Sequence, residues 1–167
     1  MSVDWAEVYR ATYEDLVRFL HRKVWDADRA RDLAQEAFVR ALDHAPDNPR
    51  AWLFTVAGNL ARDEARSAIR RRQHLTLIRG EAAERTAPDP AEELEREQRM
   101  ELVRAALSRL SERDRDALLL WDAGLSYGEI AAETGLAQGA VGTTLARARR
   151  RLAEAYEALE GEDVAHR

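Results

Sequence analysis

The chain has 167 residues, of which 46% are hydrophobic and 34% are charged, and its formal net charge is -5 at pH 7. This length fits one domain or two small ones, and the acidic balance argues against a general polycation that coats nucleic acid. Cysteine is absent, which excludes disulfides, zinc–thiolate sites and thiol chemistry. The low numbers of glycine (8) and proline (4) favour helices over a sheet protein.

Apolar residues at helical spacing predict three helices before residue 73. The first covers about residues 3–24 and the second about 28–42. The third begins where Asn48 can cap a helix and Pro49 suits its first position, and it runs to about residue 72. The core face of the second helix is predicted to consist of Ala30, Leu33, Ala34, Ala37, Phe38, Ala41 and Leu42.

The second half of the chain predicts another helical domain. Residues 74–93 hold a glycine, two prolines and little periodicity, so we expect a flexible acidic linker there. Residues 94–160 return to helical periodicity, and 161–167 are expected to form a short tail. The predicted fold is therefore all-α, with two small helical domains (1–73 and 94–160) joined by the linker.

The segment "LSYGEIAAETGLAQGAVGTTLARARRRL" (125–152) has the pattern of a helix-turn-helix. Ser126 and Glu129 form a capping box, Gly135 ends the short helix, and a longer helix begins near Gln138. Such a motif places its second helix in the major groove of DNA. The pattern alone fits an αα-hairpin equally well, but the run of arginines from Arg147 to Arg151 favours DNA, because arginines bind phosphates.

Two other polar faces have a structural and a functional interpretation. The helix that follows Trp52 alternates arginines with Asn59 and Asp63, which suits strand-separated DNA but also a solvated face. The row formed by Asp32, Gln35 and Glu36 could bind a basic partner or simply face water. Residue chemistry alone favours the solvated interpretation for both.

Sequence motifs for catalysis are missing. The chain has no phosphate-binding or dinucleotide-binding glycine motif and no G-x-S-x-G elbow. Its four histidines are scattered and match no metal-ligand spacing. We therefore expect no enzyme activity, no catalytic residue, no metal and no cofactor.

Three blocks together resemble the extracytoplasmic-function group of bacterial RNA polymerase sigma factors. They are "DLAQEAFVRAL" (32–42), "PRAWLFTVAGNLARDEAR" (49–66) and "LSERDRDALLLWDAGLSYGEIAAETGLAQGAVGTTLARARRRL" (110–152). The resemblance implies a promoter-specificity subunit whose first domain is region two and whose second is region four. It implies core RNA polymerase (the β′ clamp helices and the β subunit), promoter DNA and an anti-sigma factor as partners of a cytoplasmic protein that is monomeric when free.

The resemblance also implies three sets of site residues. The β′ clamp helices would be bound by Asp32, Gln35, Glu36 and Phe38. The minus-ten element, with a flipped base at Asn59, would be bound by His44, Asp47, Asn48, Asn59, Arg62, Asp63, Arg66 and Arg70. The minus-thirty-five element would be bound by Ser126, Tyr127, Gln138, Gly139, Thr143, Thr144, Arg147, Arg149 and Arg150.

Two other functions are open on residue chemistry. The first is a stand-alone helix-turn-helix transcriptional regulator, although such proteins generally dimerise on two half-sites and no dimer helix is evident. The second is an interaction module that does not contact DNA. Charge reversal at Arg149 and Arg150 would leave the activity of such a module intact.

Overall fold

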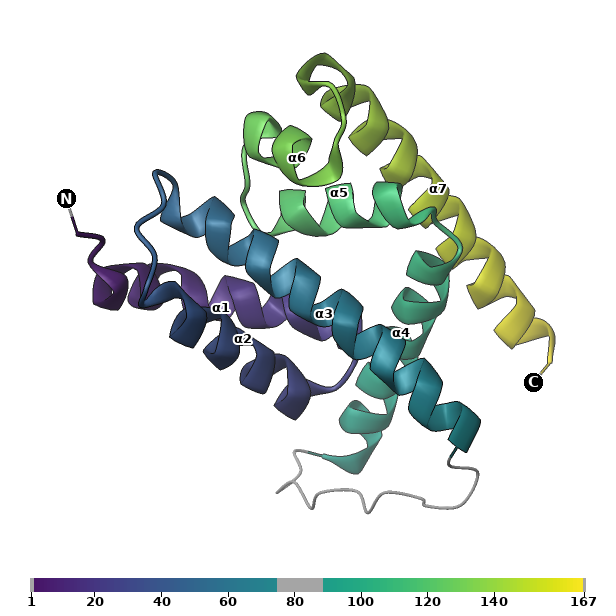
Figure 1. Cartoon of the computed structure of the whole chain (residues 1–167). Coiled ribbons are helices and arrows are strands. Elements are labelled where there is room, and N and C mark those ends of the chain that lie inside the picture. The colour runs from purple at the N-terminus through teal and green to yellow at the C-terminus, as the bar shows by residue number, and fades with distance from the viewer. Residues whose placement is uncertain (1, 75–88, 167) are drawn as a thin grey trace.

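The computed structural model describes residues 2–74 and 89–166, with only the backbone for residues 68–74 (Figure 1). The described residues form helices and no strand, so the predicted all-α class is confirmed. Most of the predicted linker, residues 75–88, lies outside the described residues.

The first domain contains helices α1 (Trp5–Val24), α2 (Ala27–Ala41) and α3 (Pro49–His74). The side chains of Asp4 and Asp26 cap α1 and α2 by accepting hydrogen bonds from backbone N–H groups of the first turn. The three helices pack around a buried apolar core that includes Leu16, Leu20, Leu33, Leu53 and Phe54. The prediction that Leu42 lies on the core face is wrong. Leu42 follows the end of α2, and it is 66% exposed.

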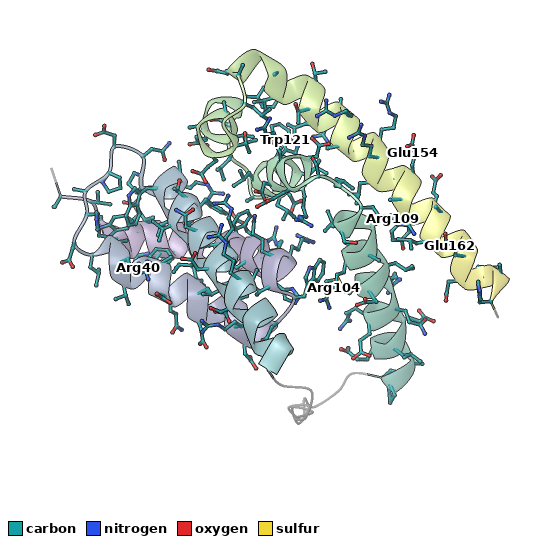
Figure 2. All side chains as sticks on the ribbon, turned by 45° about the vertical axis from the view of Figure 1, so that its right-hand side comes forward. Arg40, Arg104, Arg109, Trp121, Glu154 and Glu162 are labelled. Carbon is teal, nitrogen blue, oxygen red and sulfur yellow. The ribbon has the colours of Figure 1, made fainter. Side chains whose placement is uncertain are left out.

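The second domain contains helices α4 (Pro90–Ser108), α5 (Glu112–Asp122), α6 (Tyr127–Thr134) and α7 (Gln138–Ala165). Helix α4 begins four residues before the predicted start of the domain, because Asp89 caps it and Pro90 occupies its first position. Helix α7 continues through most of the predicted tail. Figure 2 shows this C-terminal part beside α4, where Arg109 forms an ion pair with Glu162 at 3.7 Å.

The predicted helix-turn-helix is present in α6 and α7. Ser126 and Glu129 form the capping box at the start of α6, and Gly135 ends this helix with a φ of 72°. Gly124 has a φ of 89° in the turn between α5 and α6, a conformation that glycine adopts without strain. These local signals were strong enough to predict the motif from sequence.

The two domains touch each other in the structure. Helix α5 lies beside α1 and α3, and α6 lies near the start of α3 (Figure 1). Buried apolar residues of both domains belong to one continuous cluster. This contact brings acidic side chains of the second domain to polar side chains of the first.

Candidate nucleic-acid and polymerase interfaces

The exposed face of α2 carries the residues predicted to bind polymerase. Asp32 and Gln35 are exposed and Glu36 is half-buried, at the i, i+3 and i+4 positions of one helix face. Asp32 lies 3.8 Å from Arg29, and Glu36 accepts a hydrogen bond from Arg40 at 2.6 Å. Surface pairs of this kind are weak and exchange easily for pairs with a partner.

Phe38 does not belong to this face. It is 8% exposed, and its ring lies 4.9 Å from that of Tyr9 in an edge-to-face arrangement. Phe38 packs from α2 against α1 and leaves little of its side chain for a partner. Val39, which sequence reasoning missed, is exposed and continues the face of Asp32, Gln35 and Glu36 by one turn. Its spacing of seven residues from Asp32 was the available signal.

The loop before α3 is held by aromatic packing. The ring of His44 lies 4.9 Å from that of Trp52, and the Trp5 indole N–H donates to the carbonyl of His44 at 3.3 Å. Asn48 caps α3 as predicted, accepting from the N–H of Ala51 at 3.1 Å. Contacts thus hold the backbone and ring of His44, which is exposed, as are Asp43, Ala45 and Asp47.

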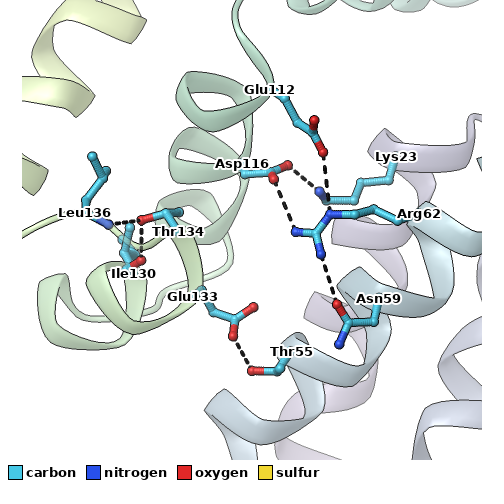
Figure 3. Close-up of polar contacts among 10 residues, drawn as sticks. All are labelled: Lys23, Thr55, Asn59, Arg62, Glu112, Asp116, Ile130, Glu133, Thr134 and Leu136. Atoms are coloured by element: carbon cyan, nitrogen blue, oxygen red, sulfur yellow. Dashed lines mark hydrogen bonds and ion pairs between the residues drawn. The ribbon is translucent and has the colours of Figure 1, made fainter.

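The predicted minus-ten residues of α3 form a polar face. Asn59, Asp63 and Arg66 are exposed, and Asn59 accepts a hydrogen bond from Arg62 at 2.9 Å. The guanidinium of Arg62 also lies 3.6 Å from Asp116 of the second domain (Figure 3). The side chain of Arg70 lies outside the described residues.

The N-terminal part of α7 has three exposed residues among those predicted to contact DNA. They are Gln138, Gly139 and Thr143. Thr144 is different: it is 4% exposed, because it shares the core side of the helix with Val141, Leu145 and Ala148. Thr144 therefore leaves almost none of its surface for a base, and its side chain belongs to the core.

The arginines of α7 have different surroundings. Arg147 and Arg151 donate hydrogen bonds to Asp114 at 2.9 and 3.3 Å. Arg149 lies over the ring of Trp121 with 5.5 Å between guanidinium carbon and ring centroid. Arg150 is exposed and forms no ion pair with any described residue. Of the predicted phosphate contacts, Arg150 is thus the most available, and Arg147 also has a structural role.

Asp114 is a residue that sequence reasoning missed in this role. It is only 2% exposed, so its carboxylate is held almost entirely by the two arginines. Its backbone N–H also donates to the hydroxyl of Ser111, the cap of α5, at 3.2 Å. Sequence pattern could not reveal that α7 crosses α5 at this point.

The start of α6 contributes the remaining predicted contacts. Ser126 and Tyr127 are exposed, and the Tyr127 ring lies 5.3 Å from that of Trp121. A Cβ atom at Gly142 would lie 3.4 Å from the Tyr127 ring, an ordinary van der Waals contact, so the site has room for a methyl group. The backbone N–H of Ser126 donates to Glu129 and lowers the pKa of that carboxyl below its ordinary value, with further hydrogen bonds from Asn48 and Ser126 acting in the same direction.

No helix in the described part of the chain is long and apolar enough to cross a membrane. Within residues 2–74 and 89–166 no group of three or more histidine, aspartate or glutamate side chains is arranged to hold a metal ion.

Similarity to known proteins covers both domains. The family model "Sigma-70 region 2" matches residues 8–73, and the model "Sigma-70, region 4" matches residues 100–152. RNA polymerase sigma factor YlaC of Bacillus subtilis is 31% identical over 150 residues, which cover 86% of each chain. ECF RNA polymerase sigma factor EcfG of Rhodopseudomonas palustris is 38% identical over 133 residues, covering 76% of this chain and 71% of EcfG.

Solved structures agree with this assignment. The sigma factor RpoE of Bartonella quintana, in complex with the anti-sigma factor NepR, superimposes with a TM-score of 0.64 and 25% identity, over 92% of this chain and 97% of RpoE. CnrH, in complex with the cytosolic domain of CnrY, also gives a TM-score of 0.64, with 26% identity over 92% and 88% of the two chains. The chain belongs to the extracytoplasmic-function group of bacterial RNA polymerase sigma factors, with region two in α1–α3 and region four in α4–α7.

Proposed function

We propose that this sigma factor uses three separate surfaces to direct promoter-specific initiation. The observation that carries the proposal is the exposure of Gln138, Thr143 and Arg150 on α7, the second helix of the helix-turn-helix. Polar residues near the start of the helix and a basic residue further along are what a major-groove helix requires. Gln138 and Thr143 would contact bases of the minus-thirty-five element, while Arg149 and Arg150 would bind phosphates.

The minus-ten element would bind to the first half of α3 and the loop before it. Asn59 is exposed and would contact an extruded base, and Arg62 and Arg66 would track the strand by pairing with phosphates. The aromatic packing around His44 supports this assignment, because a pocket for one base requires a loop of fixed shape.

The exposed face of α2 would bind core polymerase. Asp32, Gln35 and Glu36 offer acceptors for basic groups of the β′ clamp helices, and Val39 adds apolar contact area. Such a mixed face is typical of an interface between folded partners. We further infer a cytoplasmic, non-enzymatic protein that is controlled by an anti-sigma factor. The complex of the similar sigma factor RpoE with the anti-sigma factor NepR supports that last inference.

Run-off transcription with purified core polymerase tests the proposal. We expect transcripts from a promoter library only when the chain is added, and loss of these transcripts for the double variant Arg149→Glu, Arg150→Glu. The matched control is Arg10→Glu with Arg18→Glu, two exposed arginines of α1 that carry no proposed contact. A stand-alone regulator would instead bind palindromic DNA as a dimer and would not co-elute with core polymerase, which would overturn the proposal.

A further inference from the structure

Two exposed aromatic rings lie next to each other on the second domain. Trp121 belongs to the last turn of α5 and Tyr127 is the first residue of α6, and their ring centroids are 5.3 Å apart. The two residues are 40% and 41% exposed, so a large part of each ring faces solvent. Neighbouring apolar groups that stay exposed in a folded domain point to a contact surface.

Both rings lie against the same side of α7. A Cβ atom at Gly142 would be 3.6 Å from the hydroxyl oxygen of Tyr127, and the guanidinium carbon of Arg149 is 5.5 Å from the centroid of the Trp121 ring. Gly142 and Arg149 are close to two helical turns apart, so they share one side of α7 and are separated by about 10.5 Å along its axis. We call Tyr127, Trp121 and Arg149 the aromatic edge.

The contact with Trp121 leaves the hydrogen-bond donors of Arg149 unused. A guanidinium that lies over an aromatic ring is attracted through its flat face, while its N–H groups point outward in the plane of the group. Arg149 forms no hydrogen bond or ion pair with any residue of the described ranges. Asp122, the carboxylate next to Trp121, accepts a hydrogen bond from Arg22 at 3.0 Å instead. Arg149 therefore combines a restrained position with donors that can bind an anion.

The neighbouring arginines of α7 lack this combination. Arg147 and Arg151 donate hydrogen bonds to Asp114, so part of their donor capacity is used within the fold. Arg150 is exposed and has no ion pair or ring contact within the described part of the chain. An arginine that is not restrained loses rotamer freedom when it binds a phosphate, and this loss reduces the affinity gained.

We propose that Trp121 is a positioning residue for DNA binding, whose ring holds Arg149 in the orientation that binds a phosphate of the minus-thirty-five duplex. An indole suits this role, because tryptophan is the best aromatic partner of a cation and has only two side-chain torsions to order. Tyr127 contacts the ring of Trp121 and places a hydroxyl group on the same edge. The inference rests on the proposed function, in which α7 binds the duplex.

Phosphate contacts position a protein on DNA and do not read its sequence. The contribution of Trp121 should therefore be the same for duplexes of different sequence. A duplex of mixed sequence is thus a sufficient probe, provided that the ionic strength is low enough for phosphate contacts to supply most of the binding.

A double-mutant cycle with the full chain tests the proposal. The probe is a short fluorescein-labelled duplex of mixed sequence, and the readout is anisotropy at one low ionic strength. The cycle consists of Trp121→Leu, Arg149→Ala and the combined variant. The matched control cycle replaces Arg149→Ala with Arg150→Ala, which removes the next arginine, an exposed side chain. Melting temperatures of all variants show whether each chain is folded at the temperature of the binding measurement.

We expect Trp121→Leu to weaken binding about fivefold, because Arg149 must then be ordered at the moment of binding. The same substitution should have almost no effect in the Arg149→Ala chain, whereas it should keep its full effect in the Arg150→Ala chain. Trp121→Phe retains an aromatic face and should restore most of the affinity. Equal losses in all three chains, or no loss in the natural chain, would overturn the proposal.

The salt dependence of binding tests the phosphate contact itself. Arg149→Ala should reduce the slope of log affinity against log salt by about 1, because one phosphate is no longer neutralised. An unchanged slope would show that Arg149 binds no phosphate and would also overturn the proposal.

Run-off transcription separates this inference from the proposed function. A chain that initiates with core polymerase, but whose two cycles give the same result, is a sigma factor in which Trp121 has no positioning role. A chain that does not initiate contradicts the proposed function itself.

Discussion

Asp114 of α5 and Arg147 of α7 form an ion pair of 2.9 Å, in which the aspartate is 2% exposed and the arginine side chain is 41% exposed. Arg151, one turn further along α7, approaches the other oxygen of Asp114 at 3.3 Å. Two arginines on one helix and one buried carboxylate on another define the rotation of α7 about its axis. That rotation decides which residues of α7 point toward DNA.

Replacement of Asp114 by alanine should therefore lower both stability and DNA affinity. We expect the free energy of unfolding to fall by about 2 kcal/mol, because a buried acceptor is lost while the partly exposed arginines regain water. Urea unfolding measures this change. Glu154→Gln, on the exposed side of α7, is the control and should change stability by less than about 0.5 kcal/mol. Equal effects of the two substitutions would contradict the role of Asp114.

Arg150 and Arg147 should respond differently to substitution by alanine. Arg150→Ala should weaken binding to a minus-thirty-five duplex and reduce the slope of log affinity against log salt by about 1, because one phosphate contact is lost. Its unfolding free energy should stay unchanged, since Arg150 is exposed. Arg147→Ala should destabilise the fold, because it leaves Asp114 with one partner. Salt titrations and urea curves on both variants distinguish the two roles.

Gly142 offers a way to stabilise the α7 helix. A Cβ at this position would touch the Tyr127 ring at ordinary van der Waals distance, and alanine favours a helix over glycine. Gly142→Ala should therefore raise the free energy of unfolding by about 0.5–1 kcal/mol.

Thr144→Arg should have the opposite effect and lower the free energy of unfolding by more than about 2 kcal/mol, because it would bury a charge. Thermal unfolding compares the two, and a stable Thr144→Arg protein would refute the burial of Thr144.

Val39 provides the test of the polymerase face. Val39→Asp should reduce co-elution with core polymerase at least tenfold, a loss of about 1.4 kcal/mol of binding energy, with no change in melting temperature, since the side chain is exposed. Phe38→Ala is the contrasting variant and should cost about 3 kcal/mol of stability, because it empties part of the core. Gel filtration with core polymerase and thermal unfolding provide the two readouts. Unimpaired co-elution of Val39→Asp would exclude Val39 from the interface.

Glu129 should make stability depend on pH. Its pKa in the folded chain is lowered by the hydrogen bond from the Ser126 backbone, so its charged form stabilises the fold. That contribution is present above the ordinary glutamate pKa of about 4.3 and is lost as the pH falls through the lower folded-state pKa. Glu129→Gln removes the charge and leaves one acceptor oxygen where the carboxylate uses two, one for Asn48 and one for the Ser126 N–H. It should be less stable than the natural chain by about 1 kcal/mol at pH 7. Urea unfolding across this range should show the difference narrowing with acid, and a constant difference would contradict the assignment.

The local structure was accessible to sequence reasoning because its signals lie within one turn of helix. Ser126, Glu129 and Gly135 predicted the bounds of α6, and Asn48 with Pro49 predicted the start of α3. Helix α4 begins at Pro90, four residues before the predicted start of the domain, in a stretch whose acidic residues resemble the end of the linker. Glutamates in a first turn in fact favour the helix.

The order of the helices, the helix-turn-helix and the family follow from the sequence alone, because caps, periodicity and motifs are properties of neighbouring residues. Tertiary structure decided which side of each helix is exposed where helices cross. It buried Thr144 and Phe38, joined Asp114 to Arg147 across 33 residues, and brought Asp116 to Lys23 across 93. The exposure of a side chain and the partner of a charge depend on which residues pack against it, and those residues are distant in the sequence.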